Sequence, residues 1–123
     1  MGFERFDVVR VPFPFTDRQA TKNRPALVVS DGAAFNGPAG HSVLAMITTS
    51  SLPAWPLDCA IGDLAACGLP AASVVRWKLF TLDHQLIRGV LGRLAEPDVA
   101  VVTAALGRLL GCQPVCTNEP RQE

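Results

Sequence analysis

The sequence predicts a mainly β domain that curls into a small barrel and carries one C-terminal helix. Three observations lead to this prediction. Short apolar runs rich in β-branched residues recur along the first 94 residues, turn signals separate them, and only the segment 97–110 has a helical period. Short strands with frequent turns are typical of small barrels.

The predicted strands are apolar runs without a helical period. The most regular are 7–11, 26–29, 42–48 and 73–77, with weaker candidates at 56–61 and 86–94. The run 26–29 is apolar throughout, which predicts a central strand buried on both faces. Pro12 and Pro14 follow the first run, and we expect them to break ladder pairing, as at a sheet edge or a strand exit, because proline cannot donate to a ladder. The polar or glycine-rich segments are predicted to be loops at 16–23 and 36–40, and a turn or short helical piece at 80–85.

The segment 97–110 predicts the one helix. Its apolar residues recur every three or four positions, at Val99, Val102, Leu106, Leu109 and Leu110. Pro97 suits the first turn, where its missing N–H costs nothing, and Gly111 suits the position after the end. We therefore expect a single domain over 1–111 and a flexible tail over 112–123.

Charge is balanced overall but unevenly distributed. The chain has 11 basic and 11 acidic residues, which argues against indiscriminate nucleic-acid binding. Residues 1–24 nevertheless hold five basic and three acidic side chains, and residues 76–93 hold four basic and one acidic. If the fold brings these two segments together, they form a local positive groove; otherwise they are scattered solvated charges.

The cysteines and histidines do not suggest a metal site. Cys59, Cys67, Cys112 and Cys116 form no C-x-x-C pair, and neither His41 nor His84 flanks them at ligand spacing. We expect free thiols, no metal and no other cofactor. Since no run approaches the roughly 18 apolar residues of a membrane span, and charges interrupt the first fifteen residues, we expect a cytoplasmic protein.

Five short motifs occur in an order that resembles the MazF/PemK toxins. They lie at 7–13, with the sequence DVVRVPF; at 23–30, NRPALVVS; at 45–50, AMITTS; at 68–76, GLP followed by SVVR; and at 80–94, FTLD followed by GRL. The resemblance covers about residues 5–111. It implies an SH3-like barrel that forms a homodimer, with single-stranded RNA bound in a groove near the dimer interface. It further implies metal-independent endoribonuclease activity and a MazE/PemI-like antitoxin as partner.

The resemblance also implies that Arg24 and Thr48 are the catalytic residues. The chemistry is sensible, because a guanidinium is planar, always charged and bidentate toward phosphate, and a hydroxyl donates a further hydrogen bond. Arg24 begins one predicted strand and Thr48 ends another, so antiparallel pairing would bring them to one rim. As a base, arginine is too weak at neutral pH, and His84 is a better candidate than His41, which lies at the other end of the strand that Thr48 ends.

Further residues are candidates for RNA contact: Phe15, Asp17, Arg18, Lys22, Thr49, Arg76 and Lys78. The loop that contains Asp17, Arg18 and Lys22 could close on substrate, or it could be an ordinary hairpin loop. Arg76 and Lys78 could instead form a solvated strand face. Trp55, Trp77 and Phe15 could stack bases, although tryptophan in so short a chain is more often core or dimer interface.

Two other functions fit the same fold. The first is a CcdB-like toxin that inhibits DNA gyrase through its C-terminal helix and needs no Arg/Thr pair. The second, motivated by the neutral charge, is a catalytically silent barrel that serves as an antitoxin or repressor partner.

Overall fold

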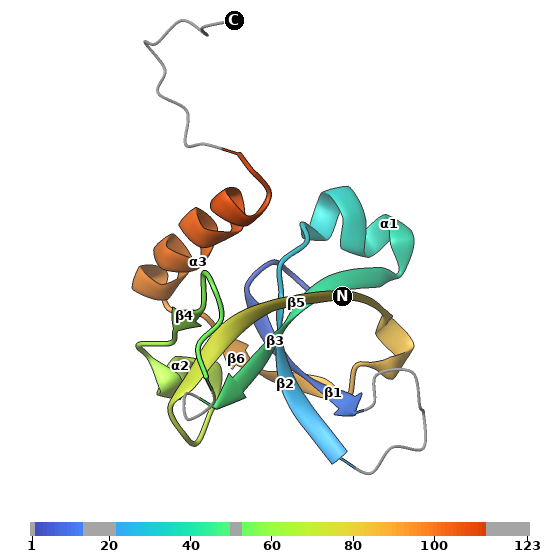
Figure 1. The fold of residues 1–123 in the computed structure, drawn as a ribbon. Coiled ribbons are helices and arrows are strands. Elements are labelled where there is room, and N and C mark those ends of the chain that lie inside the picture. The colour runs from blue at the N-terminus through green and yellow to red at the C-terminus, as the bar shows by residue number, and fades with distance from the viewer. Residues whose placement is uncertain (1, 14–21, 50–52, 113–123) are drawn as a thin grey trace, which may run out of the picture.

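The computed structural model describes residues 2–13, 22–49 and 53–112. Its six strands form one antiparallel sheet in the order β4-β5-β3-β2-β1-β6, which curls into a half-barrel, with the C-terminal helix on one side (Figure 1). The strands are β1 (Asp7–Phe13), β2 (Lys22–Val28), β3 (His41–Thr49), β4 (Cys59–Ala60), β5 (Ser73–Asp83) and β6 (Gly89–Arg93). The helical elements are η1 (Gly32–Asn36), α1 (Gly37–Ala39), α2 (Leu64–Cys67), η2 (His84–Leu86) and α3 (Glu96–Leu109). The predicted β class with a C-terminal helix is confirmed.

The two faces of the sheet bury different cores, because successive strand residues point to opposite sides. One core lies between the sheet and α3; it contains Val8, Leu27, Ala45, Ile47, Val75 and Trp77 with Val102, Ala105 and Leu106. The other core contains Val9, Val11, Ala26, Val28, Leu44 and Leu82, with Phe3, Phe80, Leu86 and Ile87 packed against it. The centre of the sheet is thus buried on both faces, as the unbroken apolar run 26–29 predicted.

Pro12 does not end the strand, but it lies at a sheet edge, which is the other position expected for it. β1 continues to Phe13, and Pro12 is aligned with Asn23 in the β1–β2 register. β1 pairs with β6 only as far as Arg10, so beyond that point it has a strand neighbour on one side alone. A proline is tolerated in such a half-paired stretch, where a missing N–H need not leave a gap in the sheet.

The loop predicted at 36–40 contains helical structure instead. Asp31 caps η1, its carboxylate accepting from the Ala34 N–H at 2.8 Å, and α1 follows directly. Asn36 is fully buried between them and donates to the carbonyls of Phe3 and Ser30. These contacts reach outside the segment, which explains why its own sequence does not predict them. The helix α2, which the sequence analysis did not predict, is likewise fixed by a cap from Asp63.

An irregularity in the pairing of β3 with β5 shapes the face opposite α3. Ala45 is aligned with Leu79, but the next residue, Met46, is aligned with Arg76, so two residues of β5 are skipped. On one side of this bulge the face is the closed core around Leu44 and Leu82. On the other side lie Met46, Thr48 and Arg76, which share that face without belonging to the core, and this part is called the open half of the face below. No helix among the described residues is long and apolar enough to cross a membrane.

Candidate active site

Arg24 and Thr48 come from neighbouring strands and meet on the open half of the face. The β2–β3 register aligns Ala26 with Met46 and Val28 with Leu44. Continued by two residues, the same register puts Arg24 opposite Thr48, on the same face of the sheet. Both residues line one pocket at this end of the sheet, together with Ile47 and Leu69 of the core with α3. The register thus places Arg24 and Thr48 at one rim of the sheet, and their catalytic role stays a prediction.

The pocket has a volume of about 170 Å³ and is walled by both strands and one loop. Its lining is Arg24, Pro25, Ile47, Thr48, Thr49, Leu69, Pro70, Ala71 and Ser73. Within the described part of the chain, neither the Arg24 guanidinium nor the Thr48 hydroxyl has a hydrogen-bond partner. The wall is otherwise mostly apolar, and Thr49 and Ser73 add two further hydroxyl groups to it.

Phe13 supports the arginine from β1. The Cζ atom of Arg24 lies 4.9 Å from the centroid of the Phe13 ring. A guanidinium over an aromatic face is attracted to the ring and loses freedom of movement. Arg24 is also preceded by extended backbone and followed by Pro25, which restricts its own backbone to β geometry. The guanidinium is therefore oriented by the ring, and no residue in 2–13, 22–49 or 53–112 forms an ion pair with it.

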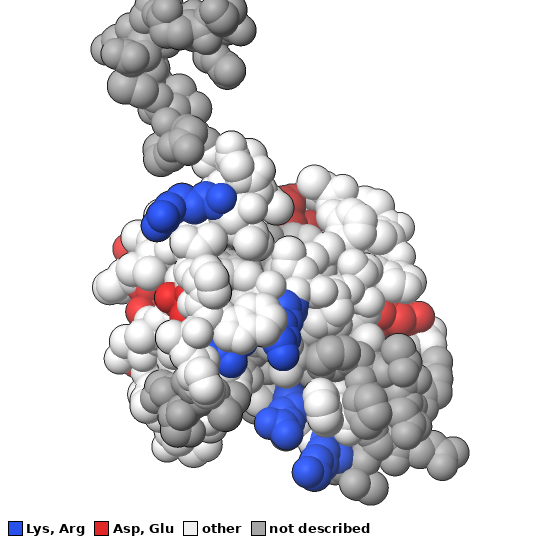
Figure 2. Space-filling view, viewed as in Figure 1, with Lys and Arg blue, Asp and Glu red and all other residues white. Residues whose placement is uncertain are grey.

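Basic side chains gather on the face that bears this pocket. Figure 2 shows Lys and Arg side chains over β5, β3 and the start of β2, while the acidic side chains in that view lie at its flanks. Lys22 and Arg24 on β2 and Lys78 on β5 are exposed. The two basic segments of the sequence thus come together in the fold, which favours the groove over scattered charge.

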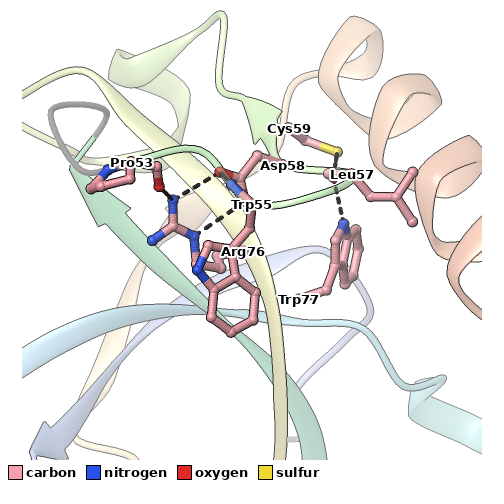
Figure 3. Close-up of polar contacts among 7 residues, drawn as sticks. All are labelled: Pro53, Trp55, Leu57, Asp58, Cys59, Arg76 and Trp77. Carbon is pink, nitrogen blue, oxygen red and sulfur yellow. Dashed lines mark hydrogen bonds and ion pairs between the residues drawn. The ribbon is translucent and has the colours of Figure 1, made fainter.

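Arg76, a predicted RNA contact, is instead bound to the protein. It is only 6% exposed, and its guanidinium donates to both oxygens of Asp58 at 3.2 and 2.9 Å and to the Pro53 carbonyl at 2.6 Å (Figure 3). The hydrogen bonds from Arg76 hold the pKa of the Asp58 carboxyl below its ordinary value. Its charge is therefore largely compensated, and the solvated strand face considered for this residue is wrong.

The other predicted residues fall into three groups. Thr49 is exposed at the end of β3 and lines the pocket beside Thr48. Phe15, Asp17 and Arg18 lie outside the described residues. His84 is at the wrong end of the molecule for proton transfer: its neighbour Asp83 is aligned with His41, eight residues along β3 from Thr49.

Several residues of the site were not predicted from the sequence. Phe13 was included only as part of a motif, and Ser73 and the loop 69–71 were not considered as pocket walls. The motif GLP at 68–70 was the one signal that could have pointed to this wall. The pairing of Asp58 with Arg76 could not be predicted from a local pattern, because the two residues are 18 positions apart.

The pocket lining described above contains no carboxylate, imidazole or thiol. The described residues also form no group of three or more His, Cys, Asp or Glu that could hold a metal ion. Cys59 and Cys67 are free and buried, Cys112 is free and exposed, and burial raises the pKa of the Cys67 thiol to about 11. The chemistry available at the pocket is accordingly charge stabilisation and hydrogen bonding.

The chain is thus a curled six-stranded antiparallel sheet with a C-terminal helix, and Arg24 and Thr48 line a pocket at one end of the sheet. The family model described as PemK-like, MazF-like toxin of type II toxin–antitoxin system matches residues 4–110. The chain therefore belongs to that family.

Several solved structures share the fold of this chain. A MazE–MazF crystal structure from Deinococcus radiodurans is 24% identical with a TM-score of 0.69, covering 92% of this chain and 99% of the other. An endoribonuclease in complex with its cognate antitoxin from Mycobacterial species is 22% identical with a TM-score of 0.71, again covering 92% and 99%. The toxin MazF-mt6 of Mycobacterium tuberculosis is 18% identical with a TM-score of 0.68, covering 88% and 99%. No curated protein matches the sequence.

Proposed function

We propose that this protein is the toxin of a type II toxin–antitoxin system and a sequence-specific, metal-independent endoribonuclease that cleaves single-stranded RNA. The observation that carries the proposal is the shared pocket of Arg24 and Thr48, in a chain of the PemK-like, MazF-like family. The cut leaves a 2′,3′-cyclic phosphate and a 5′-hydroxyl.

The reaction needs charge stabilisation more than it needs a metal. The ribose 2′-oxygen attacks the adjacent phosphorus, the bond from phosphorus to the 5′-oxygen breaks, and a proton passes from the 2′-hydroxyl to the departing 5′-oxygen. Negative charge grows on the phosphoryl oxygens during the attack. Arg24 neutralises that charge with parallel N–H donors, and Thr48 donates a hydrogen bond to the same phosphoryl group.

Proton transfer does not use a histidine or carboxylate of the described pocket, since none lines it. Arg24 acts as a cation rather than as a base, because a guanidinium carries its charge at all physiological pH values. Solvent molecules carry the proton from the 2′-hydroxyl to the 5′-oxygen. This division of labour predicts that loss of Arg24 removes transition-state stabilisation rather than a titrating group.

The exposed cations hold the RNA backbone on both sides of the pocket. Lys22 and Lys78 bind neighbouring phosphates, and Thr49 contacts the nucleotide next to the cut. Phe15, Asp17 and Arg18, in the segment before β2, complete the RNA contacts. Arg76 acts indirectly, since its ion pair with Asp58 holds the segment around Trp55 in place.

The partners proposed are a second copy of the chain and a cognate antitoxin. Two of the similar structures are toxins in complex with an antitoxin, and both cover almost the whole of their toxin chain. An antitoxin that inhibits the enzyme would have to cover the open half of the face. We expect both proteins in the cytoplasm, where the RNA is.

A cleavage assay tests the proposal directly. Purified protein is incubated with long single-stranded RNA in excess EDTA, and the ends are mapped by primer extension and by phosphorylation of free 5′-hydroxyls. We expect cleavage at a few sequences in EDTA, with a rate about a hundredfold lower for Arg24→Ala. Thr48→Val should also be strongly impaired, whereas Arg108→Ala on the exposed end of α3 and Thr81→Val on β5 should match the wild type.

Three results would contradict the proposal. If RNA stays intact in the presence of wild-type protein, with and without divalent ions, the proposed ribonuclease activity is contradicted. Cleavage that EDTA abolishes removes metal independence. Equal rates for the wild type and Arg24→Ala remove the assigned site.

A further inference from the structure

Trp55 is exposed on the open half of the face and has no role in the chemistry proposed above. Its side chain is 44% exposed, whereas Trp77 is 8% exposed and belongs to the core with α3. Burial of an indole ring is energetically favourable, so an indole that is largely exposed indicates a surface that a ligand could cover.

The segment that carries Trp55 is firmly attached to β5. Arg76 donates to the Pro53 carbonyl at 2.6 Å and binds both oxygens of Asp58, while the indole N–H of Trp77 donates to the Leu57 carbonyl at 2.7 Å. Arg76 and Trp77 are adjacent in β5 and point to opposite faces of the sheet. Their hydrogen bonds therefore hold the segment around Trp55 from both sides of the strand (Figure 3). The Trp55 N–H also donates to Asp58, which closes the turn.

The turn itself is held in a conformation that few residues adopt. Leu57 has φ of 66°, in the left-handed region, and the Asp58 N–H donates to the Trp55 carbonyl at 3.2 Å. A leucine stays in this region only where surrounding contacts determine it. Trp55 is therefore presented on a preorganised support, and a ligand would not have to order it.

Two cations adjoin the indole ring. The Nζ atom of Lys78 lies 4.9 Å and the Cζ atom of Arg76 lies 5.5 Å from its centroid. Arg76 is compensated by Asp58, but Lys78 is exposed and leaves a net positive charge beside the ring. An aromatic surface next to an exposed cation suits a ligand with flat rings and negative charge, which describes a nucleotide.

The ring also lies within reach of the pocket. Arg76, beneath Trp55, is aligned with Met46, and Val74 is aligned with Thr48 two residues further along both strands. Two strand residues span roughly 7 Å, which an extended nucleotide chain crosses in one or two steps. Trp55 thus lies against Arg76 and Lys78 of β5, and β3 with Thr48 runs between β5 and the strand β2 that carries Arg24.

We propose that Trp55 is a stacking platform for a base of the single-stranded RNA next to the scissile phosphate. This inference rests on the proposed ribonuclease function and extends it from the reacting phosphate to a base. The indole accepts any base, because every base has a π face, so Trp55 supplies affinity and strand position rather than sequence choice. Trp55 is a positioning residue, and its loss should raise KM and leave kcat nearly unchanged.

Binding and cleavage measured side by side test the platform. The binding probe is a 2′-O-methyl single-stranded oligonucleotide, which lacks the nucleophile and stays intact; its match is an abasic oligomer with the same number of phosphates. For Trp55→Ala we expect about tenfold weaker binding to the base-containing probe and no change for the abasic one. Trp55→Phe should recover most of the affinity, and Phe35→Ala, an exposed aromatic on η1, should bind like the wild type.

Tryptophan fluorescence gives a readout that a structural role would not move. The base-containing probe should quench the wild-type emission, and most of this quenching should be absent in Trp55→Phe, which retains Trp77. KM for all-ribose RNA should rise about tenfold in Trp55→Ala.

Several outcomes would overturn the platform. They are unchanged probe binding by Trp55→Ala, an equal loss on the abasic oligomer, or quenching that persists in Trp55→Phe. Unchanged RNA binding together with weaker antitoxin binding would assign the ring to a protein partner instead. If wild-type protein binds the probe and shows the Trp55 effects but cuts no all-ribose RNA, the ribonuclease proposal fails and the platform stands. If it cuts RNA and Trp55→Ala behaves like the wild type, the stacking platform fails and the ribonuclease proposal stands.

Discussion

The guanidinium of Arg24 lies over the ring of Phe13, with its Cζ atom 4.9 Å from the ring centroid. The two residues come from adjacent strands, β2 and β1, and Phe13 is 40% exposed, so the ring is not needed to fill the core. The contact orients a cation without neutralising it, which an acidic partner could not do. Phe13 is thus the support of the arginine rather than a packing residue.

Replacement of Phe13 should therefore lower activity more than stability. We expect Phe13→Leu to reduce kcat about two- to fivefold, the range of an exposed cation–π contact, with a nearly unchanged melting temperature. Turnover on single-stranded RNA and thermal melting measure the two effects. In an Arg24→Lys background the same change should cost less, and an equal loss in both backgrounds would show that Phe13 acts independently of Arg24.

Removal of His84 should affect stability and leave cleavage intact. Its Nε2 atom shares a 2.8 Å hydrogen bond with Ser42 Oγ, and its ring meets Phe3 edge-on, at the far end of β3 from the pocket. For His84→Ala we expect a loss of about 1 kcal/mol in unfolding free energy and a cleavage rate within about twofold of wild type. A rate reduced as much as in Arg24→Ala, in folded protein, would make His84 part of the active site.

The Asp58–Arg76 pair should stabilise the fold in a pH-dependent manner. Because the pKa of Asp58 is lowered in the folded state, its ionised form stabilises the protein at neutral pH, and this stabilisation is lost as the pH falls below the ordinary carboxyl value of 3.8. Asp58→Asn should lower the melting temperature by several degrees at pH 7 and by less at pH 3.

Thermal melts across this pH range measure the effect, with Glu96→Gln on α3 as a control that removes an exposed carboxylate. A difference between the wild type and Asp58→Asn that stays constant down to pH 3 would contradict the linkage. The same variant should also reduce affinity for RNA, because it releases the support of Trp55.

Gly92 should not tolerate a side chain. A Cβ atom there would overlap the Ala66 carbonyl oxygen and come within 2.7 Å of the Cys67 carbonyl carbon, both in the backbone of α2. Backbone atoms cannot move aside as a flexible side chain can, so β6 and α2 would have to separate. We expect Gly92→Ala to cost about 2 kcal/mol of unfolding free energy.

Denaturant unfolding measures this cost. Gly2→Ala is the matched control, since nothing lies within 4 Å of a Cβ atom built there. An unchanged midpoint for Gly92→Ala would mean that α2 packs less closely against β6 than the structure indicates.

Much of the frame could be predicted from residue patterns. The apolar run 26–29 indicated a strand buried on both faces, and the period of 97–110 indicated the helix α3, which extends over Glu96–Leu109. The meeting of Arg24 and Thr48 followed from their places at the start and the end of antiparallel strands. Such features depend on neighbours a few residues apart, which a single sequence shows.

Other features depend on distant partners and could not be predicted. Arg76 was expected to be accessible, because strand alternation predicts the face on which a side chain lies but not which other segment covers it. The covering residue is Asp58, which reaches Arg76 through the turn at Leu57. The helical turns at 32–39 are fixed by the burial of Asn36 against Phe3, 33 positions earlier. The continuation of β1 past Pro12 was not predicted, because the sequence of β1 does not show that its pairing with β6 ends at Arg10.

The bulge in β5, opposite Ala45 and Met46 of β3, divides one face of the sheet into a buried core and an exposed surface. On this face Met46 and Lys78 belong to neither core, so an exchange of either one leaves both cores in place. Arg76 differs, because its ion pair with Asp58 fastens the segment around Trp55. The bulge thereby separates exchangeable surface positions from the cores around Leu27 and Leu44 that keep the chain folded.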